Sequence, residues 1–574
     1  MHPCLSVDEI LRLIFRCVEV RPTLCALART CRTFNEPATD LIWETLTAVE
    51  PILQHLPSAR FVAKEGSVVR DCYYVVSENA EKHHQQTDSV QYLVLSDLLS
   101  ENDWNTIRRL SSRVRRFYTS FVDVGPDYVH NDVPLWFGSL ASPPGPGFLF
   151  PNLRDLSFQV SGYLELSSVW NHHTETFQAV IRFFHLLLGP HLSSLRFDIP
   201  AAFYAYLDIP SIPALCPNIR MLSIGGPTFN HHGCSIPDQT VSAFSKVVSE
   251  LCHLDLVRSY MTSWELLTSL AQAKALRWLW MFLPRGIGRG PEHPSGNIFP
   301  QLRALDVVAE SLVSCVDLFR WTSPNKVTEI CICCQTCEDD GDPSQTLVSM
   351  SSLISSRCKH LEFLWILSIS GAVREPLSAW PRPMLEPYQA CHHLRVIALR
   401  THCSLALADT DLEDMVKAWP HLEVFHLSHN VIMGPSRRPV HLSLRGVTAL
   451  LHRCPKLKCF TLEFDATRVP ERATRLSYGT PVRNTAVRRM GVFASPVSAS
   501  SNVTAYLSTI MPSLALIIVE IGAGYAPEWV QICTHHPRKP SICASIPVIE
   551  LNSLRAAGTE GRGRMYGEEW LGGW

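Results

Sequence analysis

The sequence predicts an α/β protein in which a short three-helix module precedes an irregular solenoid of parallel strands with return helices. Residues 1–46 contain three apolar stretches at helical spacing. A short apolar phrase then recurs in twelve copies between residues 150 and 520, with helical stretches between many of the copies. Repetition at such a period is typical of arrays in which each unit buries its apolar face against its neighbours.

The bulk composition favours a folded protein of more than one domain. The chain has 574 residues, of which 46% are apolar and 18% charged, and one hydrophobic core rarely serves so long a chain. The net charge of −2, from 51 basic and 53 acidic residues, predicts no general affinity for nucleic acid or anionic membranes.

The start of the chain does not have the pattern of a secretory signal. Asp8, Glu9 and Arg12 interrupt its first apolar stretch, and no run of the chain approaches the 18 or so uncharged apolar residues of a membrane span. We therefore expect no membrane segment and an intracellular protein, in the cytoplasm, the nucleus or both. The 20 cysteines are then expected to be reduced thiols.

Three helices are predicted in the N-terminal module. Ser6 to Glu9 has the form of a capping box, and the apolar residues from Val7 to Val18 follow helical spacing. A break at Arg21-Pro22-Thr23 precedes a second, short helix, and Pro37 suits the first turn of a third. So small a unit needs a partner to bury its apolar face, either the rest of the chain or another protein.

The order of these residues resembles an F-box. The matching runs are Leu5-x(4)-Ile10-Leu11-x(2)-Ile14-Phe15, then Leu24-x(2)-Leu27-Ala28-x(2)-Cys31-Arg32-x-Phe34, then Leu41-Ile42-Trp43. The family often has proline after the first leucine, where this chain has Ser6. The resemblance implies docking on a Skp-family adaptor and, through it, on a cullin ubiquitin ligase, by Leu5, Ile10, Leu11, Ile14, Phe15, Leu24, Leu27, Cys31, Phe34 and Trp43. The alternative is a helical cap on the domain that follows.

The recurring phrase is L-x-x-L-x-L, with aliphatic or aromatic substitutes. It begins with Leu153-Arg-Asp-Leu156-Ser-Phe158 and ends with Leu514-Ala-Leu-Ile517-Ile-Val519. Alternation in its second half predicts a short strand, and prolines before several copies stop the preceding helix. This plan resembles the irregular leucine-rich repeats behind many F-boxes, of a fungal type, although a consistent asparagine after the third apolar position is missing.

Four regions follow from these patterns. We expect an F-box at 1–46, a linker and solenoid start at 47–149, the leucine-rich-repeat-like solenoid at 150–530 with a basic, mobile insertion at 466–500, and a C-terminal tail at 531–574.

The strand register places some aromatic side chains on the open side of the sheet. Candidate target-binding residues are Trp278, Trp280, Asp306, Phe363, Trp365 and His426. Exposed aromatic residues are enriched where proteins bind partners. The alternative is that an adjoining loop, such as residues 284–298, covers them.

The sequence contains few motifs that are typical of metal, nucleotide-binding or catalytic sites. Cys331, Cys333, Cys334 and Cys337 suggest zinc, but they crowd one strand end, so a buried cysteine-rich strand is favoured and no metal or cofactor is expected. Glycine-rich runs at 286–290 and 143–147 lack the residues of nucleotide-binding loops, and no catalytic set appears. We therefore predict a non-catalytic, substrate-recognition adaptor of a cullin ligase whose repeats bind a target protein. The alternative is an interaction scaffold outside ubiquitin transfer.

Overall fold

The fold is described from a computed structural model. The described residues are 7–18, 20–64, 90–94, 99–122, 140, 143–144, 147–161, 174–198, 211–225, 251–260, 264–285, 298–322, 324–334, 343–368, 379–380, 382–401, 404–405, 407–429, 440–470, 482–493, 495–498, 500–520, 526–535 and 541–545. The chain divides into two compact units, Met1–Phe282 and Leu283–Trp574.

The first unit begins with the three expected helices. They are α1 (Asp8–Arg16), α2 (Arg21–Thr30) and α3 (Arg32–Glu44). Their shared core is formed by Leu11, Phe15, Leu24 and Ala38, and the ring of Phe34 packs edge-on against Phe15 at 5.3 Å between centroids. The helical periodicity of the sequence is therefore confirmed as three helices around one small core.

Two helix starts differ from the prediction. The residue before α1 is Val7, whose side chain makes no capping hydrogen bond, and Ser6 lies outside the described residues. The third helix begins at Arg32, so Pro37 lies inside it and not in its first turn. The proline sits one turn and a half into the helix, where it removes a single backbone hydrogen bond. The long helix remains favourable because its residues Ala38 and Trp43 are buried.

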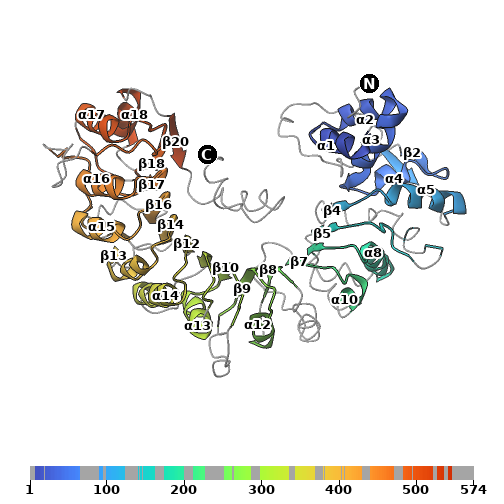
Figure 1. The fold of residues 1–574 in the computed structure, drawn as a ribbon, viewed down its shortest axis with the longest axis horizontal. Helices are drawn as coiled ribbons and strands as arrows, with labels where there is room; N and C mark the ends of the chain where they lie inside the picture. The colour runs from blue at the N-terminus through green and yellow to red at the C-terminus, as the bar shows by residue number, and fades with distance from the viewer. Residues whose placement is uncertain are drawn as a thin grey trace. The chain divides into compact units, whose positions relative to one another are not determined.

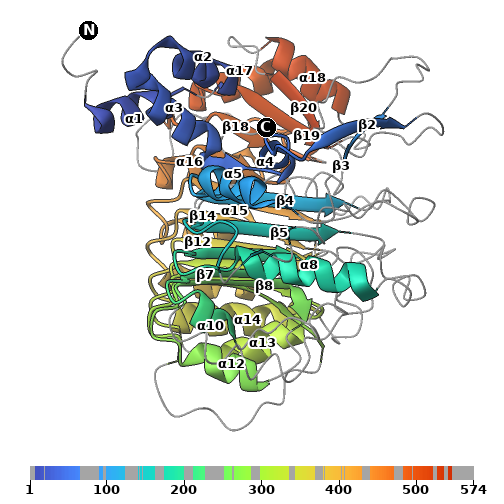
Figure 2. The same ribbon diagram turned by 90° about the vertical axis from the view of Figure 1, so that its right-hand side faces the viewer.

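A parallel sheet follows within the first unit, in the order β1-β4-β5-β6-β7-β8-β9. Its strands are β1 (Thr45–Leu46), β4 (Arg116–Val122), β5 (Asp155–Ser161), β6 (Ser194–Asp198), β7 (Met221–Gly225), β8 (His253–Tyr260) and β9 (Trp278–Leu283). The helices between them are α4 (Glu50–Leu53), α5 (Glu101–Ser111), α8 (Thr174–Leu187), α10 (Ile212–Leu215) and α12 (Trp264–Ala271). Figure 2 shows α5 and α8 beside β4 and β5, and a separate antiparallel hairpin joins β2 (Arg60–Lys64) to β3 (Val90–Val94).

The second unit repeats this plan with nine described parallel strands. They are β10 (Ala304–Ala309), β11 (Glu329–Cys334), β12 (Phe363–Ser368), β14 (Val396–Thr401), β16 (Val424–His429), β17 (Cys459–Thr461), β18 (Arg489–Gly491), β19 (Leu516–Glu520) and β20 (Ser541–Ser545). Return segments are α13 (Leu312–Trp321), α14 (Pro343–Arg357), η4 (Arg382–Met384), η5 (Glu386–Ala390), α15 (Asp409–Val416), α16 (Leu444–Arg453), α17 (Ser500–Ile510) and α18 (Ala526–His535). Within this unit the strands form one layer and the helices the other (Figure 1). A small parallel pair, β13 (Ala379–Trp380) and β15 (Ser404–Leu405), lies outside the main sheet.

Although β18 lies between the last two predicted copies, the phrase L-x-x-L-x-L sets the register between neighbouring strands of the sheet. Its middle residue pairs with the middle residue of the next copy, as Leu305 with Ile330, Ile330 with Leu364 and Leu364 with Ile397. These side chains are at most 2% exposed along β10 to β19. Burial of one aliphatic or aromatic side chain contributes about 1.5–3 kcal/mol, so this row is a main source of stability. The α/β solenoid predicted from the repeats is confirmed.

Thiols donate hydrogen bonds in the turns that lead into several strands. Three residues before the first leucine of a copy, the Sγ of Cys358 donates to the carbonyl of Pro324 at 3.7 Å, and that of Cys391 to the carbonyl of Cys358 at 3.6 Å. The Sγ of Cys454 donates to the carbonyl of Trp419 at 3.5 Å. Asn484 occupies the same turn position and donates to the carbonyls of Leu451 and Cys454. Burial raises the pKa of Cys454 to about 12, so this thiol stays protonated and able to donate.

The sheet contains strands that the repeat pattern did not include. β18 lies inside the stretch 466–500, which was predicted to be an insertion, and pairs in parallel with β17 and β19. β20 lies in the region predicted as a tail and pairs with β19. β1 and β4 lie in the region before residue 150, and β1 begins within the boundary given for the helical module. The strand rows therefore continue on both sides of the predicted solenoid.

Candidate protein-binding surfaces

The first helix is apolar on two faces. Leu11 and Phe15 face the core of the three-helix module, while Ile10, Leu13, Ile14 and Cys17 follow the opposite face at intervals of three and four residues. Leu13 is 61% exposed and Ile14 45%. We call these four residues the outer face of α1. Large apolar side chains exposed together on a short helix are typical of a surface that a partner covers.

The structure divides the ten residues assigned to adaptor docking. Leu11, Phe15, Leu24 and Trp43 are buried within the chain, so they are not accessible to a partner. Ile10, Ile14, Leu27, Cys31 and Phe34 keep accessible area, and Leu5 lies outside the described residues. Sequence reasoning missed Leu13 and Val20, which are the most exposed apolar residues here. Leu13 could have been found from the sequence, because it is an apolar residue outside the set of positions that form the buried face of α1. Val20 lies directly before α2.

Ion pairs hold the helical module against the start of the sheet. The guanidinium of Arg113, in the turn after α5, contacts the carboxylates of Asp40 and, at 2.7 Å, Glu36. Arg12 reaches the same Asp40 at 2.6 Å and Asp8 at 2.6 Å. The amide of Arg115 donates to the carbonyl of Glu44 at 2.9 Å, directly where α3 ends and β1 begins. The outer face of α1 is therefore carried on an anchored module.

The open face of the first unit presents apolar side chains. Trp278 stacks on His253 with 3.7 Å between ring centroids and contacts Trp280 edge-on at 6.1 Å. Both tryptophans retain part of their accessible area. On the same face, Tyr118 is 39% exposed and Met221 43%. Tyr118 was missed because β4 was not recognised as a repeat. Met221 was missed although it stands at the same outward position of its phrase as Trp278.

Burial makes His253 a neutral side chain. Desolvation, with a further contribution from the positive charge of Arg196, lowers the pKa of His253 to about 4. An uncharged imidazole stacked on an indole adds no net charge to this surface near neutral pH. The open face of the first unit thus offers apolar and aromatic area beside the charged side chains of Arg116, Asp155 and Arg196, suited to a partner that makes both apolar and polar contacts.

The predicted residues in the second unit are less accessible. Asp306 is only 4% exposed because both faces of β10 are buried, so the expectation of an exposed carboxylate is wrong. Phe363 and Trp365 lie 6.5 Å apart between ring centroids and keep partial exposure. The proposed covering loop, residues 284–298, lies mostly outside the described residues.

Protein groups crowd the neighbourhood of His426. Its Nε2 lies 2.8 Å from the Ser428 hydroxyl, and the ring of Phe493 stands edge-on at 6.1 Å. Phe493 follows β18 with a φ of 40°, a left-handed conformation that aims its ring back at the sheet. Burial, helped by the positive charge of Arg400, lowers the pKa of His426 to about 3. His426 is therefore covered by other residues of the chain and does not lie on an open surface.

The cysteines and the helices give no sign of a metal site or a membrane span within the described residues. Among the described residues, no three His, Cys, Asp or Glu side chains gather closely enough to hold a metal ion. Cys333 and Cys334 are buried, Cys331 is half-buried, and Cys337 lies outside the described residues. No described helix combines the length and the apolar character needed to cross a bilayer.

Comparison with known proteins identifies the N-terminal helices. Residues 8–48 match the F-box-like family model, and these helices are an F-box-like domain. No curated protein matches the chain. Among solved structures, the chain is similar to one described as the crystal structure of a Rad7 and Elc1 complex in yeast. That match has 12% identity and a TM-score of 0.35, and it covers 70% of this chain and 82% of that chain.

Proposed function

We propose that this chain is a non-catalytic, substrate-recruiting subunit of a cullin-type ubiquitin ligase. The F-box-like domain at residues 8–48 docks on a Skp-family adaptor, and the leucine-rich-repeat-type solenoid holds a target protein. The observation that carries the proposal is the outer face of α1, which leaves Leu13 and Ile14 exposed on an anchored helical module. Such a subunit acts inside the cell, in the cytoplasm, the nucleus or both.

The mechanism requires proximity and no catalytic group of this chain. When one protein binds both the ligase and the target, it raises the effective concentration of the target near the ubiquitin-carrying enzyme. The F-box supplies one surface. For the other, the open face of the first unit is the best candidate, because Tyr118, Met221 and Trp278 keep accessible area there.

Co-purification with a Skp-family adaptor tests the docking step. The full chain is co-expressed with the adaptor, alone and as the double variant Leu13→Asp with Ile14→Asp. We expect the double variant to lose the adaptor, because two charges would be buried without partners in an apolar interface. Both side chains project away from the core, so the thermal unfolding of the variant should stay close to that of the original protein.

A matched control places the same substitutions on exposed apolar residues elsewhere. Val313 on α13 and Val530 on α18 are similarly exposed, and Val313→Asp with Val530→Asp should retain the adaptor. If the unaltered chain fails to bind the adaptor, the ligase function is rejected. The alternative, an interaction scaffold that uses these helices only as a cap, then remains.

A further inference from the structure

One edge of the second unit is strongly basic although the whole chain has a net charge of −2. Five consecutive turns lead into β12, β14, β16, β17 and β18, at residues 357–363, 390–396, 417–424, 452–459 and 483–489. Together these turns carry ten lysine or arginine residues, five histidines and only two acidic residues, Glu362 and Glu423. We call this row the basic edge.

Buried leucines and backbone hydrogen bonds hold the basic edge in register. The first apolar residue of each phrase is fully buried, so its two neighbours stand at the edge. The amide of Arg395 donates to the carbonyl of Glu362 at 2.8 Å, that of Glu423 to Arg395 at 2.7 Å, and that of Lys458 to Glu423 at 2.8 Å. Strands in a sheet lie about 4.8 Å apart, so five turns extend over about 19 Å.

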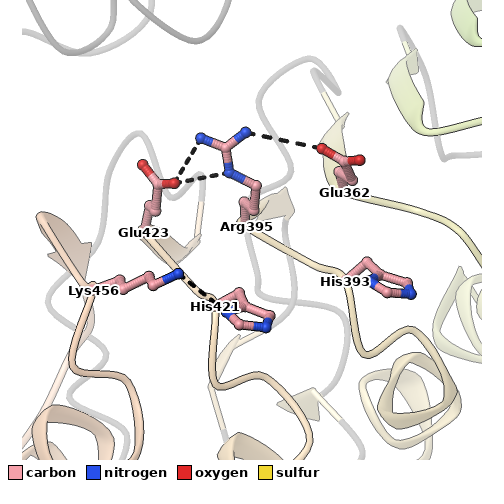
Figure 3. Close-up of a pocket in the computed structure, with 6 residues that line it drawn as sticks. All are labelled: Glu362, His393, Arg395, His421, Glu423 and Lys456. Atoms are coloured by element: carbon pink, nitrogen blue, oxygen red, sulfur yellow. Dashed lines mark hydrogen bonds and ion pairs between the residues drawn. The ribbon is translucent and has the colours of Figure 1, made fainter.

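The two glutamates are neutralised by cations of the same row. Glu423 contacts Arg395 and Lys458, each at 2.6 Å. Arg395 also lies 3.9 Å from Glu362, and Figure 3 shows its guanidinium between the two carboxylates. Burial acts to raise the pKa of Glu423, but hydrogen bonds from Lys458 and Arg395 outweigh it and lower the pKa. Asp414, on the preceding helix, is engaged by Lys417 at 2.8 Å. Within the part of the chain that is described, no carboxylate pairs with Lys359, Arg483 or Arg488.

A small pocket of about 180 Å³ opens in the middle of the basic edge. Its walls are Glu362, His393, Arg395, His421, Glu423 and Lys456. Figure 3 shows Lys456 directed at His421, where its ammonium lies 3.3 Å from Nδ1, and His393 on the same side of the pocket. A carboxylate entering here would meet Lys456 on one side and the edge of the Arg395 guanidinium on the other, which is favourable for a negative charge.

We infer that the basic edge binds an acidic, extended segment of a protein. This inference rests on the proposed function, because it adds to the open face of the first unit a second surface for the target and names the chemical class of the target segment bound there. A peptide can place its carboxylates selectively opposite Lys359, Lys456 and Arg488 and leave neutral residues at Glu362 and Glu423. A nucleic-acid backbone would bring a phosphate near each glutamate. Of the tryptophan and phenylalanine rings in these five turns, Trp419 is fully buried and Phe363 belongs to the open face, so the turns offer only histidine rings for base stacking.

Fluorescence anisotropy of a labelled alternating Glu–Ser peptide with the full chain tests the inference. The variant Lys359→Glu, Lys456→Glu, Arg488→Glu should bind the peptide at least about ten times more weakly than the unaltered chain at low salt. Binding by the unaltered chain should weaken as salt rises, since exposed charges are screened. A Lys–Ser peptide of the same length should not bind.

A matched charge reversal controls for the change in net charge. Lys274 and Arg277 stand in the turn before β9, and Lys326 in the turn before β11, and all three are exposed. The variant Lys274→Glu, Arg277→Glu, Lys326→Glu should bind the acidic peptide like the unaltered chain. Equal loss in both variants would show a general charge effect and overturn the assignment to the basic edge.

Two further results would also overturn it. One is that the unaltered chain does not bind the acidic peptide at low salt. The other is that single-stranded DNA of equal charge binds more tightly than the peptide and loses affinity in the same variant, which would make nucleic acid the partner. Adaptor co-purification of the basic-edge variant separates this test from that of the proposed function, because the F-box substitutions alone should abolish docking.

Discussion

The F-box-like domain and the repeats use apolar residues in opposite ways. In the repeats of the second unit, the middle residues of the phrases are at most 2% exposed and face only other residues of the chain. In the F-box-like domain, Leu11 and Phe15 are buried while Leu13 and Ile14 on the same helix are exposed. The repeats consume their apolar area in folding. The helical domain keeps part of it available for a partner, which favours a salt-insensitive contact there and a salt-sensitive one at the basic edge.

The largest expected effect is on the core row of the repeats. Phe425→Ala removes a fully buried ring between Ile397 and Phe460 and should lower the free energy of unfolding by about 3–5 kcal/mol. Denaturant unfolding followed by circular dichroism measures it. A loss below about 1 kcal/mol would mean that this row is not tightly packed, and the contrast with the helical domain would disappear.

A smaller effect is expected in the turns. The side chain of Asn484 donates to two backbone carbonyls and accepts from the amides of Ala486 and Val487. Asn484→Ala should destabilise the protein by about 1–3 kcal/mol, because buried backbone groups lose their partners. The variant Cys454→Ala removes a single weak thiol donor and should cost clearly less in the same unfolding experiment. Equal losses in the two variants would indicate that the volume of the side chain, and not its hydrogen bonds, determines how much each turn contributes to stability.

The lowered pKa of the His426 imidazole predicts that the stability of the protein depends on pH. The pKa of His426 is about 3 in the folded protein and about 6.5 in the unfolded chain, so the unfolded state takes up the proton first. Stability is therefore complete above about pH 6.5 and is lost as the pH falls toward 3, by at most about 1.4 kcal/mol per pH unit for one group.

Replacing the imidazole isolates its share of this dependence. His426→Gln should make the fall in Tm between neutral and mildly acidic pH less steep, and thermal unfolding at several pH values measures it. His421→Gln, at an exposed position, serves as the control and should leave the slope unchanged. Identical slopes for His426→Gln and the unaltered protein would contradict a buried neutral imidazole.

The smallest effect on stability is expected in the F-box-like domain, where an exposed apolar residue is replaced. Leu13→Ser removes an exposed side chain and should change the free energy of unfolding by no more than about 0.5 kcal/mol. The same variant should weaken binding of a Skp-family adaptor measurably, for example by calorimetric titration. Destabilisation comparable to that of Phe425→Ala would show that Leu13 belongs to the core of the chain.

The repeat phrase predicted most of the sheet because its physical cause is local. Apolar residues at fixed spacing specify a buried strand whichever partner lies beside it. β18 was missed although Val487, Met490 and Val492 fit the phrase and are fully buried, since the basic and serine-rich residues around them favoured an insertion. β4 was missed because Thr119 stands at its third apolar position. A polar residue at one of the apolar positions makes the phrase unrecognisable in the sequence, but the backbone of the strand still pairs with its neighbours.

The surfaces were harder to predict than the strands. Alternation correctly assigned Trp278 and Trp365 to the open face, but it does not state what lies above that face. Asp306 is buried and His426 is covered by Phe493, and these outcomes depend on residues distant in the sequence. The basic edge was invisible to the net charge, because its cations are separated by about thirty residues and only the sheet brings them together.

The junction of α3 and β1 has a mechanical consequence. Glu44 ends the helix and Thr45 begins the strand, which pairs with Arg116 on β4, so no residue lies between the two elements. A flexible linker would let the F-box sample many orientations, each with its own probability of a productive encounter. In this chain no flexible residue separates α3 from β1, so the orientation of the F-box-like domain is fixed relative to the first strand. The direction in which the parallel sheet of this unit extends from the F-box-like domain is thus a property of the fold itself.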